Sequence, residues 1–555
     1  MSLFPPAARR VAWFLLAVWA LAAPAAAQSN GPVRRLSIDE AVELALEQNL
    51  GVQIERLNPQ ISDLSVAQAD TAWTPSVSTT FTTNERDTPA NSFLSGAADK
   101  ITSGQISTAV NYSQAFRWGG NAAVAWDNSR STSNNIFSNF DPTLQANLSL
   151  QYSQPLLRNR TIDASRQQLL VAQKDREISD VQLQQTIATT RRNVRNAYWD
   201  LAYAVATRDV ASQSLDLAQQ SLRNTRARVE IGTMAPIDIV EASAEVARRQ
   251  EALIVAEASI EQAEDRLRAL VLDPSMPDFW STRIELTDVR ALQSAPIDLD
   301  AAVRNALNLR TDLRQAQKSL ESSDISIRYA RNQTLPDLNV QVNYGVTGLG
   351  GKQFLRGQPV GGSFIGPVIG EVSRGNGSVL GNLFTNDYPT WTLALTVGYP
   401  IGLANAEANL ARTRLERRQS EVQLQNLELQ VTTQVRDAAR QVTTNAQRVE
   451  TTRVARELSE ERLGAEEKKL AAGTSTSFFV FQAQRDLAEA RNSELRAVLD
   501  YNKSLVDFET VQETSLGGGT GTIAVPTAGT AATTGGGTAT TATAQGAGQG
   551  QGQGF

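Results

Sequence analysis

Carboxylates are the only side chains on which catalysis by this 555-residue chain could rest. The sequence contains no His and no Cys, which excludes His-based metal sites, His general bases, Ser-His-Asp triads and disulfides. The 58 Asp and Glu lie at helical-surface spacing among 52 Lys and Arg, a pattern typical of a solvated helix face. We therefore expect no enzyme activity, and we assign no catalytic, metal or cofactor-binding residue.

The elements that carry these side chains occur twice along the chain. Residues 36–46 return as residues 297–307, with Ile38 on Leu299 and an offset of 299 − 38 = 261. Each half is predicted to hold a short helix, a strand insert and a long helical hairpin. The two repeats are placed at residues 28–296 and 297–514, and such a duplication indicates a repeat architecture.

The two ends of the chain differ from the repeats. Residues 1–27 are predicted to be a secretory signal peptide, because two arginines precede an apolar run that ends in three alanines before Gln28. A membrane anchor is the alternative, but an apolar run of about a dozen residues is shorter than the roughly 20 that a transmembrane helix needs. Without this segment the net charge becomes 50 − 58 = −8, which disfavours a nucleic-acid partner. Residues 515–555 are uncharged and rich in Gly, Thr, Ala and Gln, so we expect a disordered tail.

Alternating apolar residues predict strands in both inserts. Helices are expected at residues 36–70 and 297–333, and both are followed by strands. The four predicted strands contain Val77 to Thr83, Leu144 to Tyr152, Leu338 to Tyr344 and Trp391 to Tyr399. No later stretch is apolar enough for a transmembrane helix, so any membrane insertion is expected to use such strands.

A further hairpin candidate occurs only in the first half, within residues 104–130. Alternation runs from Ile106 to Trp118, Gly119 and Gly120 can turn, and alternation resumes to Trp126. The sequence leaves open whether this hairpin joins the other strands or folds outside them.

Two long helical hairpins complete the repeats. From Ala164 to Ile231 the chain contains neither Gly nor Pro, and apolar residues recur every seven positions, typical of a coiled coil. A helix of nearly seventy residues is about 100 Å long, so it must bury its apolar stripe along its partner and its flanks against neighbouring chains. A closed ring of subunits satisfies this need. A soluble rod is the alternative.

Several of these motifs together resemble the TolC family of outer-membrane efflux proteins, over about residues 36–513. The resemblance rests on the segment from Ser37 to Val42 with Asn49, on the strand exit from Gln154 to Leu157, and on two hairpin tips, 231–238 and 472–479. Each motif is weak alone, but their order, duplication and separation are specific.

The resemblance implies an α+β membrane protein that forms a homotrimer. About four strands per subunit would build one twelve-stranded barrel in outer-membrane lipid, continued by a long α-helical coiled-coil barrel through the periplasm of a Gram-negative bacterium. The family exports small molecules or proteins with a periplasmic adaptor and an inner-membrane pump of the ABC, RND or MFS type. The same function is expected here, although the sequence names neither the cargo nor the pump.

The resemblance also assigns roles to the tips. The adaptor would dock on Gly232, Thr233, Met234, Ala235 and Pro236, and on Gly473, Thr474, Ser475, Thr476 and Ser477. The periplasmic constriction would involve Asp238, Glu241, Phe478, Phe479 and Gln482. Alternatively, the glycines only cap helices and the phenylalanines only fill the coiled coil.

A periplasmic adaptor or another coiled-coil scaffold is the competing function. An adaptor would carry one helical hairpin within β-rich domains, whereas this sequence alternates two hairpins with two strand inserts. That contrast favours the channel.

Overall fold

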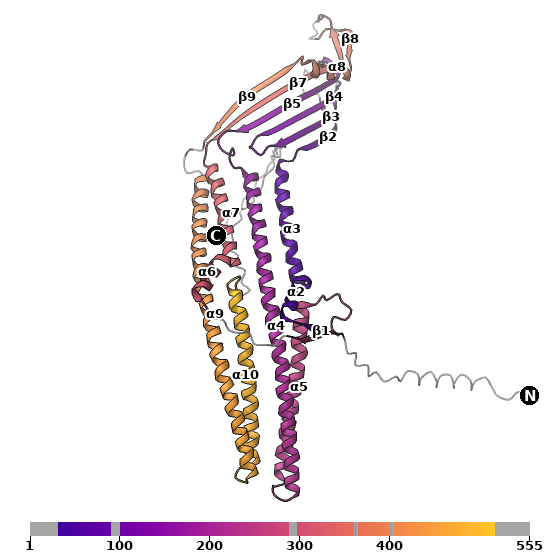
Figure 1. Ribbon diagram of the computed structural model, residues 1–555. Coiled ribbons are helices and arrows are strands. Elements are labelled where there is room, and N and C mark those ends of the chain that lie inside the picture. The colour runs from indigo at the N-terminus through magenta and orange to yellow at the C-terminus, as the bar shows by residue number, and fades with distance from the viewer. Residues whose placement is uncertain are drawn as a thin grey trace, which may run out of the picture.

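The computed structural model describes residues 32–89, 100–287, 297–359, 361, 365–399, 401 and 405–516. The molecule is long and narrow, with a β-sheet at its upper end and two helical hairpins that extend downwards (Figure 1). The predicted signal peptide and nearly all of the predicted tail lie outside the described residues, so both stay predictions. Within the described ranges, every helix is too short or too polar to cross a bilayer.

The two halves repeat one order of elements. The first contains β1 (Val33–Leu36), α2 (Ile38–Gln48), α3 (Leu50–Asp70), η1 (Thr71–Trp73), β2 (Ser76–Pro89), β3 (Lys100–Ala115), β4 (Asn121–Ser133), β5 (Phe140–Pro155), α4 (Ala164–Glu230), α5 (Ile237–Val271) and β6 (Arg283–Leu286). The second contains α6 (Leu299–Leu309), α7 (Thr311–Gln333), β7 (Asp337–Arg356), β8 (Val368–Arg374), α8 (Asn376–Thr385), β9 (Pro389–Gly398), α9 (Asn405–Ala471) and α10 (Ser477–Val511). The long helices have matching lengths, 67 residues in α4 and α9 and 35 in α5 and α10, as expected of two related hairpins.

Both predicted short helices, 36–70 and 297–333, are pairs of helices, α2–α3 and α6–α7. The first break falls at Asn49, whose side chain accepts a hydrogen bond from the backbone N–H of Gly51 at 2.9 Å. Asn49 therefore caps α3 instead of continuing α2, because its short polar side chain satisfies a free N–H of the new helix. The Asn49 amide also donates to the carbonyl of Leu270 at 3.2 Å, which ties the bend to the end of α5.

The sheet holds seven strands in six positions. The order is β2-β3-β4-β5-β7, followed by one edge position that β8 and β9 share, and all pairs are antiparallel. The hairpin candidate within residues 104–130 forms β3 and β4, and it lies inside the sheet between β2 and β5. The expected number of about four strands per subunit is therefore too low, because both extra strands alternate in phase with their neighbours and can pair along their whole length.

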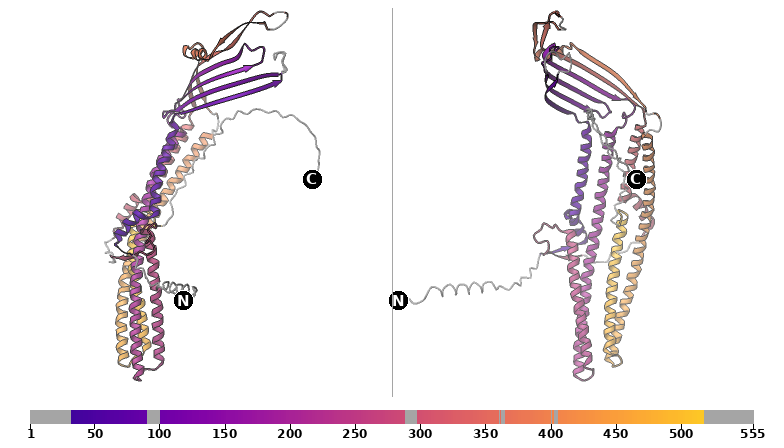
Figure 2. Two further views of the ribbon diagram at one scale, coloured as in Figure 1. Left: turned by 90° about the vertical axis from the view of Figure 1, so that its right-hand side faces the viewer. Right: turned by 180° about the vertical axis from the view of Figure 1, so that it is seen from behind.

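One face of the sheet is apolar and the other is polar. Strand partners share a face, and residues two apart along a strand return to it. One row of partners on the apolar face consists of Val77, Tyr112, Val124, Leu150, Tyr344 and Trp391. The adjacent row on the polar face consists of Ser78, Asn111, Ala125, Ser149, Gly345 and Thr390. The strands cross the upper end of the molecule at a slant to the helices (Figure 2).

Helix α8 interrupts the shared edge strand. β8 pairs with the outer part of β7 and β9 with its inner part, and α8 lies between them on the apolar face. Val379 and Leu383 of α8 pack there against Ala146 and Val346. A Cβ at Gly348 would lie 2.1 Å from the Val379 carbonyl oxygen, so only glycine lets the helix approach so closely.

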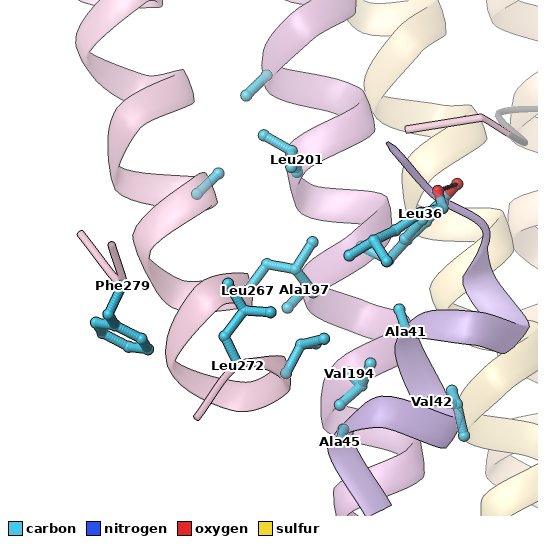
Figure 3. Close-up of a cluster of buried hydrophobic side chains, with 14 residues drawn as sticks. Leu36, Ala41, Val42, Ala45, Val194, Ala197, Leu201, Leu267, Leu272 and Phe279 are labelled. Carbon is cyan, nitrogen blue, oxygen red and sulfur yellow. Dashed lines mark hydrogen bonds between the residues drawn. The ribbon is translucent and has the colours of Figure 1, made fainter. Parts of the chain in front are cut away.

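Each long first helix has two partners placed end to end. α3 runs along the upper part of α4 and α5 along the lower part, while α7 and α10 accompany α9 in the same way (Figures 1 and 2). A waist cluster fills the junction in the first half: Leu36 and Ala41 meet Val194 and Leu201 of α4 and Leu267 of α5 (Figure 3). The parallel pair β1–β6, which the sequence did not predict, lies beside this junction.

Candidate functional site

The two hairpin tips have the same backbone geometry. Gly232 and Gly473 adopt positive φ angles of 78° and 73°. After α4, the N–H of Gly232 donates to the carbonyl of Val229 at 3.0 Å, and the N–H of Thr233 donates to that of Arg228 at 2.8 Å. These paired bonds form a Schellman motif, which ends a helix and satisfies its last carbonyls. Gly473 and Thr474 repeat it on Leu470 and Lys469 at 3.2 and 2.9 Å.

Both tips present apolar side chains to the surroundings. Ile231 is 74% exposed and Ile237 is 61% exposed at the first tip. At the second tip Phe478 and Phe479 are 53% and 49% exposed, and their rings meet edge to face with centroids 5.6 Å apart. An added Cβ at either tip glycine would meet no atom within 4 Å, so the tip surface is open.

The predicted constriction residues do not form one cluster. Asp238 accepts hydrogen bonds from the backbone N–H of Ala235 at 3.1 Å and from the Ser477 hydroxyl at 3.0 Å, so it joins the two tips. Glu241, one turn further along α5, is exposed. Phe481, two residues beyond Phe479, is buried, unlike Phe478 and Phe479.

Polar contacts connect the first hairpin to α10, and to Glu513 just beyond it, from the tips to the waist cluster, and we call this line of contacts the seam. Its pairs are Ser477–Asp238, Gln484–Ser221, Arg485–Glu245, Arg491–Gln213, Lys503–Asp200, Arg192–Asp507, Arg195–Glu509 and Arg191–Glu513. Two open grooves lie along the seam, one of about 350 Å³ next to the tips and one of about 470 Å³ above it. Polar bridges separated by open grooves indicate that the two hairpins are joined at separate points.

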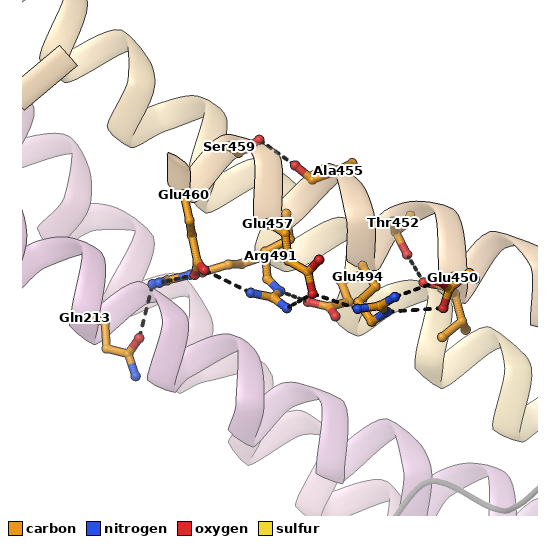
Figure 4. A network of polar contacts seen from close by, with 12 residues as sticks. Gln213, Glu450, Thr452, Ala455, Glu457, Ser459, Glu460, Arg491 and Glu494 are labelled. Atoms are coloured by element: carbon orange, nitrogen blue, oxygen red, sulfur yellow. Dashed lines mark hydrogen bonds and ion pairs between the residues drawn. The ribbon is translucent and has the colours of Figure 1, made fainter. Parts of the chain in front are cut away.

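Arg491 shows how the seam is held to α9. Its guanidinium donates to Glu460 of α9 at 2.8 Å and to Gln213 of α4 at 3.3 Å (Figure 4). The hydrogen bond from Arg491 lowers the pKa of Glu460. Arg456 of α9 pairs with both Glu460 and Glu494, at 3.0 and 2.6 Å. A connected network of charges within the second hairpin therefore positions Arg491, whose contact with the first hairpin is the neutral Gln213 side chain.

Glu245 is the seam residue that sequence reasoning missed. Its side chain is only 3% exposed, and it pairs with Arg249 of its own helix at 2.8 Å and with Arg485 of α10 at 3.3 Å. A carboxylate followed four residues later by an arginine is indistinguishable in sequence from an exposed helical ion pair. The folded structure shows that α10 packs beside Glu245, so that this carboxylate is buried and also pairs with the second hairpin through Arg485.

Comparison with known proteins identifies the protein family to which this chain belongs. The outer membrane efflux protein family model matches residues 41–271 and 302–511, one segment in each half of the chain. The chain belongs to the outer membrane efflux protein family. It is thus an efflux channel, and nothing in the comparisons supports the alternative of a periplasmic adaptor or scaffold. No curated protein matches the chain by sequence.

Solved structures share the fold of this efflux protein. VceC, an outer membrane protein of Vibrio cholerae, superposes with a TM-score of 0.59 at 13% sequence identity, over 86% of this chain and 96% of VceC. The CmeC outer membrane channel of Campylobacter jejuni gives 0.59 at 13% identity, over 86% of this chain and 85% of CmeC. The MtrE outer membrane channel of Neisseria gonorrhoeae, in its open state, gives 0.56 at 17% identity, over 87% of this chain and 90% of MtrE. At such identities the likeness shows the common fold.

Proposed function

We propose that this efflux protein is the exit duct of an export system in the outer membrane of a Gram-negative bacterium. Three copies would close the sheets into one barrel in lipid and the hairpins into a helical tube in the periplasm. The observation that carries the proposal is the two-faced sheet with helices at one end: its apolar face suits lipid and its polar face suits a water-filled lumen. No catalytic role is part of the proposal.

The hairpin tips are the proposed docking surface for a periplasmic adaptor, which would in turn bind an inner-membrane pump. The residues involved are 232–236 and 473–477. Exposed apolar side chains around two identical, glycine-ended turns support this role, because a partner helix could bury them. The adaptor's identity and the cargo would be set by the pump.

The seam is the proposed closure of the periplasmic end. Bridges such as Ser477–Asp238 and Arg485–Glu245 would hold the second hairpin against the first and narrow the passage beside Glu241, Phe479 and Gln482. Docking at the tips could then widen the tube if it separates the hairpins.

Substituting the tip glycines tests docking. Valine at both Gly232 and Gly473 should strain the turns, because β-branched residues rarely adopt positive φ. Trimers should still reach the outer membrane, while export should fall. Gly464→Val is the matched control: this residue of α9 lies near the same tip, its Cβ would also meet no atom within 4 Å, and its φ is not positive. Normal export by the double variant would show that the tips are not the docking surface. A soluble, monomeric protein would contradict the trimeric channel.

A further inference from the structure

The first repeat contributes four strands to the sheet, not two. β3 pairs with β2 over its length, from Ser76–Ser113 to Pro89–Lys100, and with β4 from Ser103–Ser133 to Ala115–Asn121. β4 in turn pairs with β5. β2 and β5 are thus separated by two complete strand positions, and each position adds about 4.8 Å to the width of a sheet.

The extra hairpin has the same two faces as the strands around it. Val110 and Tyr112 of β3, with Val124 and Trp126 of β4, continue the apolar face between β2 and β5. Asn111 lies in the polar row with its neighbours. A hairpin that folded outside the membrane would have no reason to present one apolar and one polar face in phase with both neighbours.

The turn of the hairpin is fixed where the sheet meets the helices. Arg117 pairs with Asp70 at the end of α3, and its guanidinium lies 5.2 Å from the centre of the Trp73 ring. The indole N–H of Trp118 donates to the Tyr152 hydroxyl of β5 at 3.3 Å. These contacts join the turn to the strand and helix on either side of it.

The two edge strands of the sheet, β2 and β9, can pair with each other between neighbouring copies of the chain. Among the residues that the structure describes, β2 pairs with β3 alone and β9 pairs with β7 alone. Apolar-face residues at these edges are the most exposed of their rows, with Val77 at 69% and Trp391 at 74%. Six alternating positions make β2 and β9 run in opposite directions, so β9 of one copy can extend the antiparallel order of β2 in the next. An unpaired edge cannot persist in lipid, where no water satisfies its backbone groups.

We propose that the trimer closes through β2 and β9 into a barrel of 3 × 6 = 18 strand positions, not the twelve that the family resemblance implies. The inference rests on the proposed trimeric channel and adds the partner surface of its membrane part: a second copy of this chain. Barrel diameter grows about linearly with strand number, so the outer end would be about 1.5 times as wide as a twelve-stranded barrel, in the range of water-filled porins. The extra strands have no helices of their own, so the helical tube below does not widen with them.

Cysteine pairs in the otherwise cysteine-free chain test this arrangement. Ser78→Cys with Asn111→Cys, and Ala125→Cys with Ser149→Cys, join direct strand partners on the polar face, so both should form disulfides within one chain in outer-membrane preparations. Ser78→Cys with Ser149→Cys is the matched control. These residues lie in one row but three strand spacings apart, about 14 Å, so no bond should form. A bond in the control with none in the first two would show that β2 pairs with β5, which overturns the inference.

The unmodified trimer provides a second measurement. Electron microscopy of the protein in lipid discs should show 18 strand positions and the wider outer end. Twelve strands in a trimer would overturn the eighteen-stranded barrel and leave the channel standing, whereas a protein without a closed barrel would overturn both.

Discussion

Removing the charge of Glu245 should loosen the periplasmic end of the channel. The Glu245→Gln change keeps the size of the side chain but ends the ion pair with Arg485, the only link of this carboxylate to the second hairpin among the described residues. An exposed ion pair contributes about 0.2–1 kcal/mol, and breaking a fully buried one costs about 3–5 kcal/mol. Arg485 is 37% exposed and can regain water, so we assign about 1 kcal/mol to the link.

Three copies multiply this effect if the subunits open together. About 3 kcal/mol in a trimer corresponds to about a hundredfold change in the ratio of open to closed channels, since 1.4 kcal/mol is a factor of ten. Single-channel recordings in planar bilayers measure this ratio as the open probability. Glu251→Gln, six residues further along α5 and exposed, removes the same charge and should change the open probability little.

A double-substitution cycle locates the effect. Arg485→Gln alone should open the channel as Glu245→Gln does, and the two changes together should add little to either one. If Glu245→Gln and Glu251→Gln have open probabilities within twofold of each other, the seam does not hold the channel closed. If the two effects add fully, each residue acts through other contacts.

Three more predictions concern other parts of the molecule. Asp238→Asn should weaken cation selectivity if three such carboxylates line the mouth, whereas Phe479→Ala should raise conductance without changing selectivity; unchanged recordings from both variants would place the constriction elsewhere. Gly348→Val should displace α8 from the sheet, seen as new protease cleavage between β8 and β9, while unaltered cleavage would contradict the close approach. The hydrogen bond from Lys174 lowers the pKa of Glu321 below its ordinary value of 4.5, so the stabilisation by this pair is complete above pH 4.5 and is lost as pH falls through the lowered pKa. Lys174→Met should remove about 0.5 kcal/mol of that acid-dependent stability in thermal unfolding, and an identical pH profile would show that the pair contributes nothing.

Periodic patterns made most of the fold predictable. The long helix α4 follows from 67 residues without Gly or Pro, and the strands follow from strict alternation over many residues. The break at Asn49 was missed, because the helical pattern continues through it while a single side chain caps the next helix. The place of the β3–β4 hairpin was undetermined because alternation shows that a strand is two-faced but does not show which strand lies beside it.

The candidate site was predictable only where it depends on local sequence. Gly232 and Gly473 could be found because a left-handed residue at a helix end favours glycine. The joint role of Asp238 and Ser477 could not, since it requires residues 239 positions apart to meet. Glu245 was hidden for the same reason: sequence spacing reports neighbours on one helix, whereas burial depends on what another helix brings.

The uninterrupted length of α4 makes the waist cluster a pivot. From Tyr198 in that cluster to Ile231 at the tip there are about 33 residues, or about 50 Å of helix at 1.5 Å per residue. A tilt of about 5° at the pivot would carry the tip sideways by about 4 Å. A small change in packing near Val194 and Leu267 would therefore move the hairpin tip. Substitutions in the waist cluster, far from the proposed docking surface, would then alter adaptor binding.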